Sequence, residues 1–431
     1  MDNINIALLG FGTVGSGVAE TIKKNSAIIE EQLGVKIVIK SVLVRHPNFY
    51  TGNDLLSDVR LTSDFEDIIR DESLDIVVEV MGGITPAKEY IFKALEHQIS
   101  VVSANKDLVA LYGPEIIHKA IENHVNFSCE ASVGGGIPIL MPLHQSLAAN
   151  QIESIVGILN GTTNYILSQM TEKEMAYQDA LTEAQEQGYA EADPTNDVCG
   201  FDAARKLAIL SSIGFRANVT FDDVIVEGIE KISQNDIRYA KDMGYTVKLL
   251  TVALRQENGI ALNVYPAFVP NHHPLASVKS SYNAIYVTGN IVGDVMFYGR
   301  GAGSLPTASA VMGDVMSTAQ HILNGSTGTG MIMTDTKRIP FYSFLKLKDS
   351  YYFRLIVDDV TGVLSQIASA FADNEISIRE VVQKRRIEDS AELVIITENT
   401  TRESILHVEK ALQVLPCMRK VANVIRVMEN E

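Results

Sequence analysis

The stretch INIALLGFGTVG, residues 4–15, decides the fold of the N-terminal part of this chain. Its first six residues form a short apolar run, which is typical of a strand buried on both faces. Gly10, Gly12 and Gly15 then have the G-x-G-x-x-G spacing, and a helical pattern follows at 14–29. Such glycines permit a tight turn and let a pyrophosphate approach the backbone at a helix N-terminus. We predict a dinucleotide site, with an ordinary glycine turn as the alternative.

Strand-like runs alternate with helical patterns as far as about residue 130. Further β-rich runs lie at 36–44, 75–80, 100–103 and 125–128, and the patterns at 86–97 and 114–124 are helical. Alternation of this kind predicts an α/β fold with a Rossmann-like, doubly wound parallel sheet and right-handed crossovers. We therefore expect a nucleotide-binding domain at 1–130.

The remainder is expected to form a mixed α/β domain, a linker and a small C-terminal domain. The mixed domain covers 131–303, and a helix at about 304–325 could pack back on the first domain. Glycine, serine and threonine crowd the start of a linker at 326–349. Residues 350–431 follow the order strand-helix-strand-strand-helix-strand, which predicts a ferredoxin-like unit.

Composition and charge exclude several classes of protein. A net charge of −17 argues against a nucleic-acid partner, because a protein that binds phosphate backbones needs a basic face. No stretch of about 18 uninterrupted apolar residues exists, so no membrane span is expected. The 3 cysteines lack metal-type spacing and indicate reduced thiols, which favours a cytoplasmic protein.

The end of the second predicted strand bears on the choice of cofactor. An acid at this place would bind the 2′-hydroxyl of NAD, but the chain has Arg45 instead. Because arginine accommodates a 2′-phosphate, we favour NADP(H), with NAD(H) as the other cofactor to consider. The alternative is a solvated Arg45 that binds no ligand.

A second stretch, GYAEADPTNDVCGFDAARK at 188–206, places several carboxylates near one lysine. Asp202 and Lys206 are four residues apart in a helical segment, so they share one face. A surface ion pair worth about 0.3–0.5 kcal/mol is the simplest explanation of that pair. However, Glu191 and Asp197 precede it, and the helix continues into an apolar run. We interpret the stretch as a site where carboxylates bind a substrate ammonium and Lys206 acts on a substrate oxygen.

Two shorter motifs follow predicted strands. SANK at 103–106 lies at the carboxyl end of a parallel strand, where open α/β sheets bind ligands, so Ser103 and Lys106 are candidate site residues. A surface lysine after a turn is the alternative. NGTTN at 160–164 offers Thr162 and backbone N–H groups to a polar ligand, or else provides a helix N-cap.

A glycine-rich stretch, EASVGGGIP at 130–138, separates the first two domains. Its glycines expose carbonyl oxygens and Glu130 adds a charge, which is a combination suited to a hard cation. An interdomain turn without a cation is the alternative.

The ordered series of motifs resembles that of the homoserine dehydrogenase family. The segments are GFGTVG at 10–15, SANKDL at 103–108, EASVGGGIP at 130–138, NGTTNYIL at 160–167, GYAEADPTNDVCGFDAARK at 188–206 and YGRGAGSLPTASAV at 298–311. They span most of residues 1–320, and the long acidic motif is specific to the family. The tail resembles an ACT domain, with the turn DDVTGVL at 358–364.

The resemblance implies the reversible, NAD(P)H-dependent reduction of aspartate 4-semialdehyde to homoserine, in threonine, methionine and isoleucine biosynthesis. In the family, the lysine matching Lys206 is the catalytic acid/base, and the one matching Lys106 lies between nicotinamide and substrate. Residues matching Glu191 and Asp202 hold the substrate, and Asp197 belongs to the same motif.

The resemblance also implies ligands around the cofactor and a cation. The dinucleotide is lined by Phe11, Thr13, Val14 and Gly303 besides the three loop glycines. A sodium ion is bound by the Glu130 side chain and by the main-chain oxygens of Val133, Gly135 and Ile137. The family often has alanine where this chain has Gly134, a departure that leaves these oxygens unaffected.

Family members dimerise through the central domain, so a homodimer or homotetramer is expected. The ACT-like tail implies feedback control by an amino acid, with threonine the leading candidate, in a pocket near residues 360–363. A module that serves only oligomerisation is the alternative.

Two rival functions compete with this interpretation. Aspartate semialdehyde dehydrogenase chemistry needs a cysteine nucleophile, and no cysteine of this chain lies in a sequence motif that indicates a nucleophile in a pocket. A non-catalytic regulator that binds NADP and an amino acid would leave the acidic cluster without a purpose.

Overall fold

The computed structural model describes residues 3–328, 339–387 and 389–429. It divides into two compact units: unit 1 is Met1–Ile155, Arg205–Asp223 and Asn283–Ile339, and unit 2 is Val156–Ala204, Val224–Tyr282 and Pro340–Glu431. Strand β7 (Ile152–Ile158) and helix α8 (Phe201–Gly214) each run through the division. Within the described ranges, no helix has the length and apolar character needed to cross a membrane.

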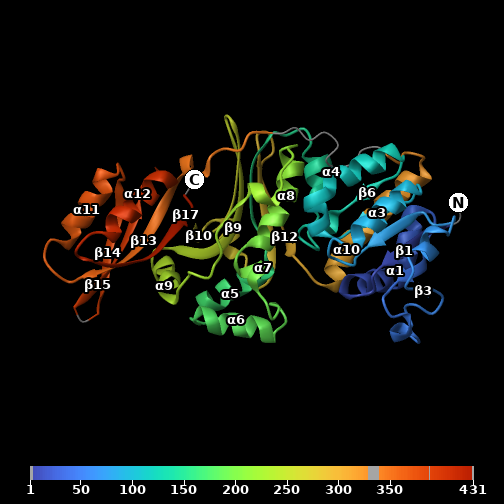
Figure 1. Ribbon diagram of the computed structural model, residues 1–431, viewed down its shortest axis with the longest axis horizontal. Helices are drawn as coiled ribbons and strands as arrows, with labels where there is room; N and C mark the ends of the chain where they lie inside the picture. The colour runs from blue at the N-terminus through green and yellow to red at the C-terminus, as the bar shows by residue number, and fades with distance from the viewer. Residues whose placement is uncertain (1–2, 329–338, 388, 430–431) are drawn as a thin grey trace. The chain divides into compact units, whose positions relative to one another are not determined.

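Six parallel strands form the sheet of unit 1, in the order β3-β2-β1-β4-β5-β6. Figure 1 shows β1, β3 and β6 of this sheet in blue to cyan. They are β1 (Asn3–Leu9), β2 (Lys36–Leu43), β3 (Arg60–Thr62), β4 (Ile76–Glu79), β5 (Ser100–Ser103) and β6 (Phe127–Ser128). The strand order reverses between β1 and β4, which is the place where open α/β sheets bind ligands. The predicted doubly wound parallel sheet is confirmed.

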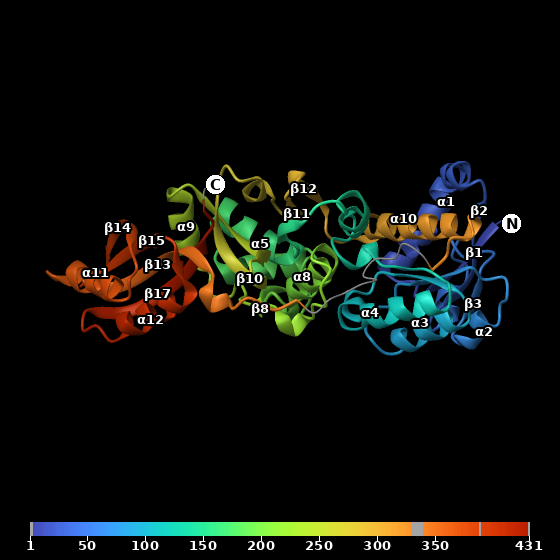
Figure 2. The same ribbon diagram turned by 90° about the horizontal axis from the view of Figure 1, so that it is seen from above.

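Helices cover both faces of this sheet. Figure 2 shows α1 (Thr13–Leu33) and α10 (Ser304–Leu323) on one face, and α3 (Ala87–Glu96) and α4 (Lys106–Glu122) on the other. Apolar residues of α1 and α10 share one core cluster with the central strands. Two further elements of unit 1 are β11 (Tyr282–Gly289), whose first residue falls in unit 2, and its neighbour β12 (Gly293–Arg300).

The start of α4 differs from the sequence prediction. The pattern predicted a helix at 114–124, with Pro114 in its first turn, but the helix already begins at Lys106 and contains Pro114. The reason is a cap: the Asn105 side chain accepts a hydrogen bond from Leu108 N at 3.2 Å. The strand β3 and the short helix α2 (Glu66–Ile69) were not predicted, because three or four residues give no readable period.

The sheet of unit 2 contains a series of neighbouring strands. Their order is β9 (Tyr245–Gln256), β10 (Gly259–Pro270), β17 (Met418–Val427), β13 (Lys348–Asp358), β15 (Ser390–Thr397) and β14 (Ile378–Ile387). A parallel pairing of β10 with β17, Ala267 opposite Arg426 and Phe268 opposite Val427, joins the C-terminal strands to the hairpin β9–β10. The C-terminal part runs β13, α11 (Val363–Asp373), β14, β15, α12 (Arg402–Gln413), β17, which confirms the predicted ferredoxin-like order. Both helices pack on its strands in one apolar core.

The remaining elements of unit 2 are α5 (Gly161–Glu172), α6 (Tyr177–Glu186), α7 (Thr195–Val198), β8 (Ile225–Val226), α9 (Gln234–Asp242) and the two-residue strand β16 (Thr400–Thr401). Helix α9 was not predicted from the sequence, and it begins with a capping box between Ser233 and Asp236. Arg354 of β13 donates from Nε to Asp236 at 2.7 Å and from Nη1 to Glu392 at 3.1 Å. Because all three residues are buried, this cluster ties α9 firmly to the C-terminal sheet.

Part of the predicted linker at 326–349 lies outside the described residues, namely 329–338. Its later part is held to β10, because Ile260 N donates to Pro340 O at 3.0 Å and Tyr342 N donates to Ile260 O at 2.8 Å. Strand β13 begins at Lys348, so the predicted linker ends slightly earlier than expected.

The close approach of α1 and α10 gives a test of the unit 1 core. A Cβ atom added at Gly17 would lie 2.7 Å from Ser304 Oγ and 2.8 Å from Ser304 O. Gly17→Ala should therefore lower the free energy of unfolding by about 1–3 kcal/mol, the usual cost of overpacking. A Cβ at Gly313 in α10 meets nothing within 4 Å, so Gly313→Ala should instead stabilise by roughly 0.5–1 kcal/mol. Urea denaturation of both variants checks the contrast, and a neutral Gly17→Ala would contradict the packing.

Candidate active site

The glycine loop has the geometry that a pyrophosphate requires. Gly10 has φ 101°, and its N–H donates to Leu43 O at 3.0 Å. A Cβ at Gly15 would collide with Gly10 O, so only glycine fits there. Helix α1 begins after Gly12, and no side chain from the described part of the chain caps that end. The free N–H groups of the first turn therefore suit an anionic group, and the residues present fit a dinucleotide.

The other predicted cofactor residues lie around this loop. Ser304 Oγ donates to Thr13 O at 2.7 Å, which places Gly303, the N-cap of α10, beside the loop. The Phe11 ring contacts Tyr50 edge to face at 5.5 Å between centroids. Arg45 is exposed just beyond the carboxyl end of β2, the strand that pairs with β1.

A buried acid, Glu79, organises the carboxyl ends of β4 and β5. Ser103 Oγ donates to Glu79 Oε2 at 2.7 Å, Met81 N donates to Oε1 at 2.9 Å, and Asn105 N donates to Ser103 Oγ at 3.1 Å. Burial raises the pKa of the Glu79 carboxyl, against the lowering effect of the Ser103 hydrogen bond. The Ser103 hydroxyl thus serves this network, which fixes the segment leading to Lys106. Glu79 was not among the predicted site residues, although an acid inside the apolar run DIVVEV at 75–80 was a signal.

The two candidate lysines are brought to neighbouring helices of unit 1. Asp107 of α4 and Arg205 of α8 form an ion pair with 3.3 Å between Oδ1 and Nε. Lys106 and Lys206 are the direct chain neighbours of this pair, and both side chains are half-buried. Residues a hundred positions apart in the chain are therefore held close together.

In unit 2, one amide holds two of the predicted carboxylates. Asn160 Nδ2 donates to Asp197 Oδ1 at 2.7 Å and to Asp202 Oδ2 at 2.9 Å. The Asn160 Oδ1 atom accepts from Thr163 N at 2.8 Å and so caps α5. Two carboxylates fixed this close to each other favour a cation beside them. The N-cap alternative is thus confirmed for the NGTTN motif, and the cap also orients Asp197 and Asp202.

Two other predicted substrate-binding residues are Glu191, which lies in the loop before α7, and Thr162, which contacts that loop from α5. Thr162 Oγ1 donates to Tyr189 O at 2.5 Å, which ties the start of α5 to the loop before α7. Glu191 is exposed in that loop, and its backbone oxygen accepts from Gln185 Nε2 at 3.0 Å. Asp202 stands one helical turn before Lys206 in α8, the spacing that the sequence indicated.

The Glu130 carboxylate closes the turn of its own loop. Its Oε1 accepts from Ile139 N at 2.6 Å and from Leu140 N at 2.8 Å, and its Oε2 accepts from Met141 N at 2.8 Å. Gly134 has φ 72°, where glycine is the least strained residue, which accounts for its place in this loop.

Three carbonyl oxygens in the same loop remain available for a cation. No hydrogen bond between described residues ends on the carbonyl oxygen of Val133, Gly135 or Ile137, although all three residues are buried. The described residues also contain no group of three or more His, Cys, Asp and Glu that suits a metal. A cation here would depend on main-chain oxygens with one carboxylate, and hard-cation chemistry fits that donor set.

Asp314 of α10 is a buried acid beside this loop that the sequence analysis missed. Glu130 N donates to Asp314 Oδ2 at 2.8 Å. Burial, followed by the charge of Glu130, raises the pKa of the Asp314 carboxyl well above its ordinary value. Burial therefore favours the protonated form of Asp314 beside this loop.

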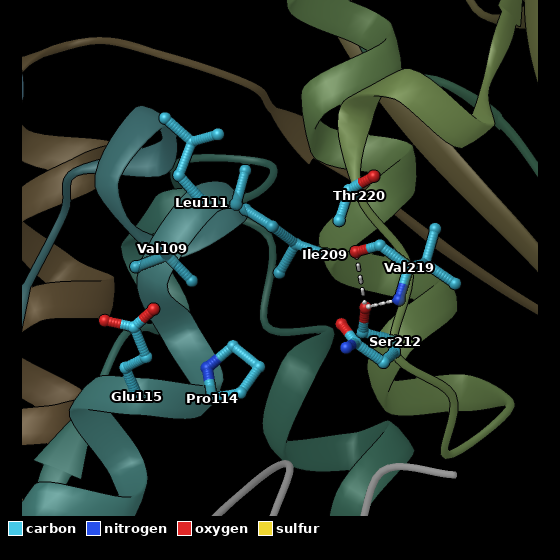
Figure 3. A pocket seen from close by; sticks show the side chains of 10 residues that line it. Val109, Leu111, Pro114, Glu115, Ile209, Ser212, Val219 and Thr220 are labelled. Carbon is cyan, nitrogen blue, oxygen red and sulfur yellow. Dashed lines mark hydrogen bonds between the residues drawn. The ribbon is translucent and has the colours of Figure 1, made fainter. Parts of the chain in front are cut away.

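A separate pocket of about 220 Å³ lies between α4 and α8, further along both helices than the two lysines (Figure 3). Its lining is mostly apolar, and Ser212 Oγ and Val219 N are hydrogen-bonded to each other at 3.2 Å. Glu115 is its one charged lining residue among those described. We assign this pocket no part in the chemistry, because none of the candidate site residues lines it.

Three family profiles match the chain. The profile for homoserine dehydrogenase matches residues 138–316, and the one for the homoserine dehydrogenase NAD-binding domain matches residues 10–130. The ACT domain profile matches residues 351–417.

Curated relatives and solved structures agree with these matches. Homoserine dehydrogenase of Bacillus subtilis is 40% identical, with 100% of this chain and 99% of the relative covered. That of Synechocystis is 41% identical, with 99% of each covered. A homoserine dehydrogenase structure from Thiobacillus denitrificans has a TM-score of 0.93 at 37% identity and covers 100% of this chain and 99% of its own. A hyperthermophilic archaeal homoserine dehydrogenase in complex with NADPH has a TM-score of 0.63 at 28% identity, over 73% of this chain and 97% of its own.

The raised pKa of Asp314 gives a pH test. Above its ordinary value of 3.8, the unfolded state loses a proton that the folded state retains, so folding stability falls as the pH rises. Asp314→Asn removes this dependence and keeps an oxygen acceptor for Glu130 N. We expect the variant to gain stability relative to the parent chain as the pH rises from about 4 to 7. Denaturant unfolding at several pH values measures the difference.

Asp67 provides an opposite control for that experiment. A hydrogen bond from Thr62 lowers the pKa of Asp67, so its contribution to stability is present at neutral pH and is lost in acid. Asp67→Asn should therefore lose stability relative to the parent chain as the pH rises. The same direction for both variants would contradict the raised pKa of Asp314.

Proposed function

Because this chain belongs to the homoserine dehydrogenase family and is an oxidoreductase acting on a CH–OH group, we propose that it catalyses the reversible reduction of aspartate 4-semialdehyde to homoserine. The reaction serves threonine, methionine and isoleucine biosynthesis. The observation that carries the proposal is the Asn160 clamp, which fixes the carboxylates of Asp197 in α7 and of Asp202, one helical turn before Lys206 in α8.

The cofactor half of the reaction rests on the loop of unit 1. A bound nicotinamide dinucleotide supplies the hydride. The uncapped first turn of α1 binds the pyrophosphate, and Phe11, Thr13, Val14 and Gly303 line the rest of the cofactor. Ser103 acts through its hydrogen bond to Glu79. This bond fixes the carboxyl end of β5 and so the segment that leads to Lys106, the first residue of α4.

One of the two lysines provides the proton, and the other provides positive charge. As the aldehyde oxygen of the substrate gains negative charge, a nearby ammonium stabilises it and donates a proton to it. We assign this acid/base role to Lys206, with Lys106 supplying positive charge beside the reacting carbonyl. Support comes from the Asp107–Arg205 ion pair, which keeps the chain neighbours of both lysines together.

The carboxylates bind the amino-acid end of the substrate. Asp197 and Asp202 are held side by side by a neutral amide, so an ammonium group is the complementary ligand. Glu191, exposed in the adjacent loop, adds a third carboxylate, and Thr162 fixes that loop to α5. These residues orient the substrate and lower its freedom of movement before hydride transfer.

NADP(H) is the favoured cofactor, with NAD(H) as the alternative. Arg45 stands at the end of β2, where it accommodates a 2′-phosphate, and an archaeal relative has been solved with NADPH. A sodium ion bound by Glu130 and the carbonyl oxygens of Val133, Gly135 and Ile137 fits the oxygen donors of that loop.

The ACT domain is proposed to bind an amino-acid effector, with threonine the leading candidate, near the turn at 360–363. At this turn Val360 is 63% exposed and Leu364 is 51% exposed, so apolar surface is available to an effector or a second ACT domain. The Arg354 cluster attaches the ACT domain to α9, and the β10–β17 pairing attaches it to the hairpin β9–β10. We expect a cytoplasmic homodimer or homotetramer.

Aspartate semialdehyde dehydrogenase is the less favoured function, because it needs a thiolate nucleophile. Cys129 and Cys417 are buried. Burial raises the pKa of the Cys129 thiol, and burial and then a hydrogen bond to Glu230 raise that of Cys199. Raised pKa values oppose the thiolate form that such chemistry requires.

Oxidation of homoserine with NADP⁺ and with NAD⁺, each with and without threonine, tests the proposed function. The parent chain should turn over homoserine without phosphate, and Lys206→Ala should lower kcat by about 10²–10⁴-fold, the usual contribution of a general acid. Lys241→Ala, a change at an exposed lysine of α9, is the matched control and should leave kcat unchanged. No turnover with either cofactor would end the proposal, and near-normal turnover of Lys206→Ala would end the role of this lysine.

The role of Arg45 is tested by comparing the two cofactors. Arg45→Ala should raise KM for NADPH by about tenfold or more, because the charge-assisted contact to the 2′-phosphate is lost. KM for NADH should stay within about twofold, since that cofactor has only a hydroxyl at this place. Steady-state kinetics in the reductive direction provides both values. An equal effect on the two cofactors would mean that Arg45 does not bind the phosphate.

A further inference from the structure

Lys248, in the middle of β9, is a buried lysine that the proposed mechanism does not use. Its residue is 2% exposed, and its Nζ donates to Asn164 Oδ1 at 2.9 Å and to the carbonyl oxygen of Val278. Both partners are neutral, and the described residues contain no ion pair to Lys248 within 4.0 Å. Burial lowers the pKa of the Lys248 amine to about 7.

The Lys248 contact sets the orientation of the Asn164 side chain. With Oδ1 facing Lys248, Asn164 Nδ2 faces three carbonyl oxygens: Val278 at 3.1 Å, Ser280 at 2.9 Å and Tyr282 at 3.1 Å. Ser280 has φ 55°, an unfavourable conformation for serine, and its N–H donates to Ser168 Oγ at 3.1 Å. Strained backbone of this kind persists only where its surroundings hold it in place, and it often lies near functional sites.

The same helix carries the carboxylate clamp. Asn164 N donates to Asn160 O at 3.3 Å in the first turn of α5, and Asn160 Nδ2 then donates to Asp197 and Asp202. Hydrogen bonds, joined through the covalent structure of the two asparagines, therefore connect Lys248 to both carboxylates. Lys248, Asn164 and Asn160 belong to β9 and to the first turn of α5, so this path lies inside unit 2.

We propose that Lys248 is a positioning residue, which acts through Asn164 to fix the first turn of α5. The carboxylates of Asp197 and Asp202, which Asn160 holds in place for the substrate, are fixed with it. The proposal rests on the proposed function for its catalytic consequence, because it concerns the affinity of the amino-acid substrate. Lys248 itself does not contact the substrate. Its role is to keep two like-charged carboxylates in one arrangement.

An amine suits this position better than an apolar side chain of equal length. The Lys248 amine donates to both Asn164 Oδ1 and Val278 O, whereas methionine fills the space, removes the donor to Asn164 Oδ1 and leaves Val278 O with the Asn164 Nδ2 donor alone. The charged groups that face Lys248 are Glu172 of α5 and Lys279, which form an ion pair with each other at 2.8 Å. Their effects on the pKa of Lys248 oppose each other, so burial remains the main cause.

Steady-state kinetics of Lys248→Met tests the proposal. KM for homoserine should rise by about tenfold or more, while KM for NADP⁺ stays within about twofold, because the glycine loop does not depend on α5. Lys241→Met makes the same substitution at an exposed lysine of α9 and should leave both values unchanged. A KM for homoserine within twofold of the parent value would overturn the positioning role. Absence of homoserine oxidation by the parent chain would instead overturn the proposed function.

Asn164→Ala and the double variant test the path. Asn164→Ala leaves Lys248 in place and should show the same selective rise in KM for homoserine, so the proposal remains testable if Lys248→Met does not fold. In the double variant Lys248→Met/Asn164→Ala, the increases in KM for homoserine of the two single variants should not multiply, because both residues act through one contact. Multiplied effects would show that Lys248 acts by another route.

The pH dependence of folding gives a readout that needs no substrate. Because the folded pKa of Lys248 lies near 7 and the unfolded value near 10.5, the unfolded state binds more protons between these values. Stability of the parent chain should therefore rise relative to Lys248→Met as the pH increases from about 7 to 10. A flat difference would mean that Lys248 is not held as a neutral amine, and it would overturn the account of its contacts.

Discussion

One side-chain amide, that of Asn160, holds two carboxylates that would otherwise repel each other. Its Nδ2 atom donates to Asp197 and Asp202, while its Oδ1 atom caps α5. The same residue thus starts a helix and defines a negatively charged site. Any change in the first turn of α5 moves both charges, which is why the buried contacts of Asn164 and Lys248 bear on the chemistry.

Buried acids stand at two places in unit 1, and they differ in the hydrogen bonds that they accept. Glu79 and Asp314 are buried among few charges, and desolvation raises both pKa values. Glu130, by contrast, accepts three backbone N–H groups, which stabilise a carboxylate. The loop at 130–138 therefore offers one carboxyl group held by three backbone N–H groups, together with several carbonyl oxygens. That set of oxygens is what a monovalent cation site would need.

Much of the fold and part of the candidate site followed from local patterns. The G-x-G-x-x-G loop, the alternation of strands and helices and the order of the C-terminal elements were predicted, because each depends on residues a few positions apart. The extent of α4 and the presence of α9 were not predicted. Asn105 extends the first, and a capping box and the buried Arg354 cluster stabilise the second, so neither depended on apolar periodicity.

The sequence by itself determined the identity of the chemical groups: a glycine loop, two lysines, an acidic motif and a family resemblance that the comparisons confirm. Only the tertiary structure decided which groups meet. It joined Asp107 to Arg205 and Asn160 to Asp197 and Asp202, and it buried Lys248 against Asn164. The physical reason is that sequence patterns report neighbours within a few residues, whereas burial and hydrogen bonding between distant segments arise only when the chain packs.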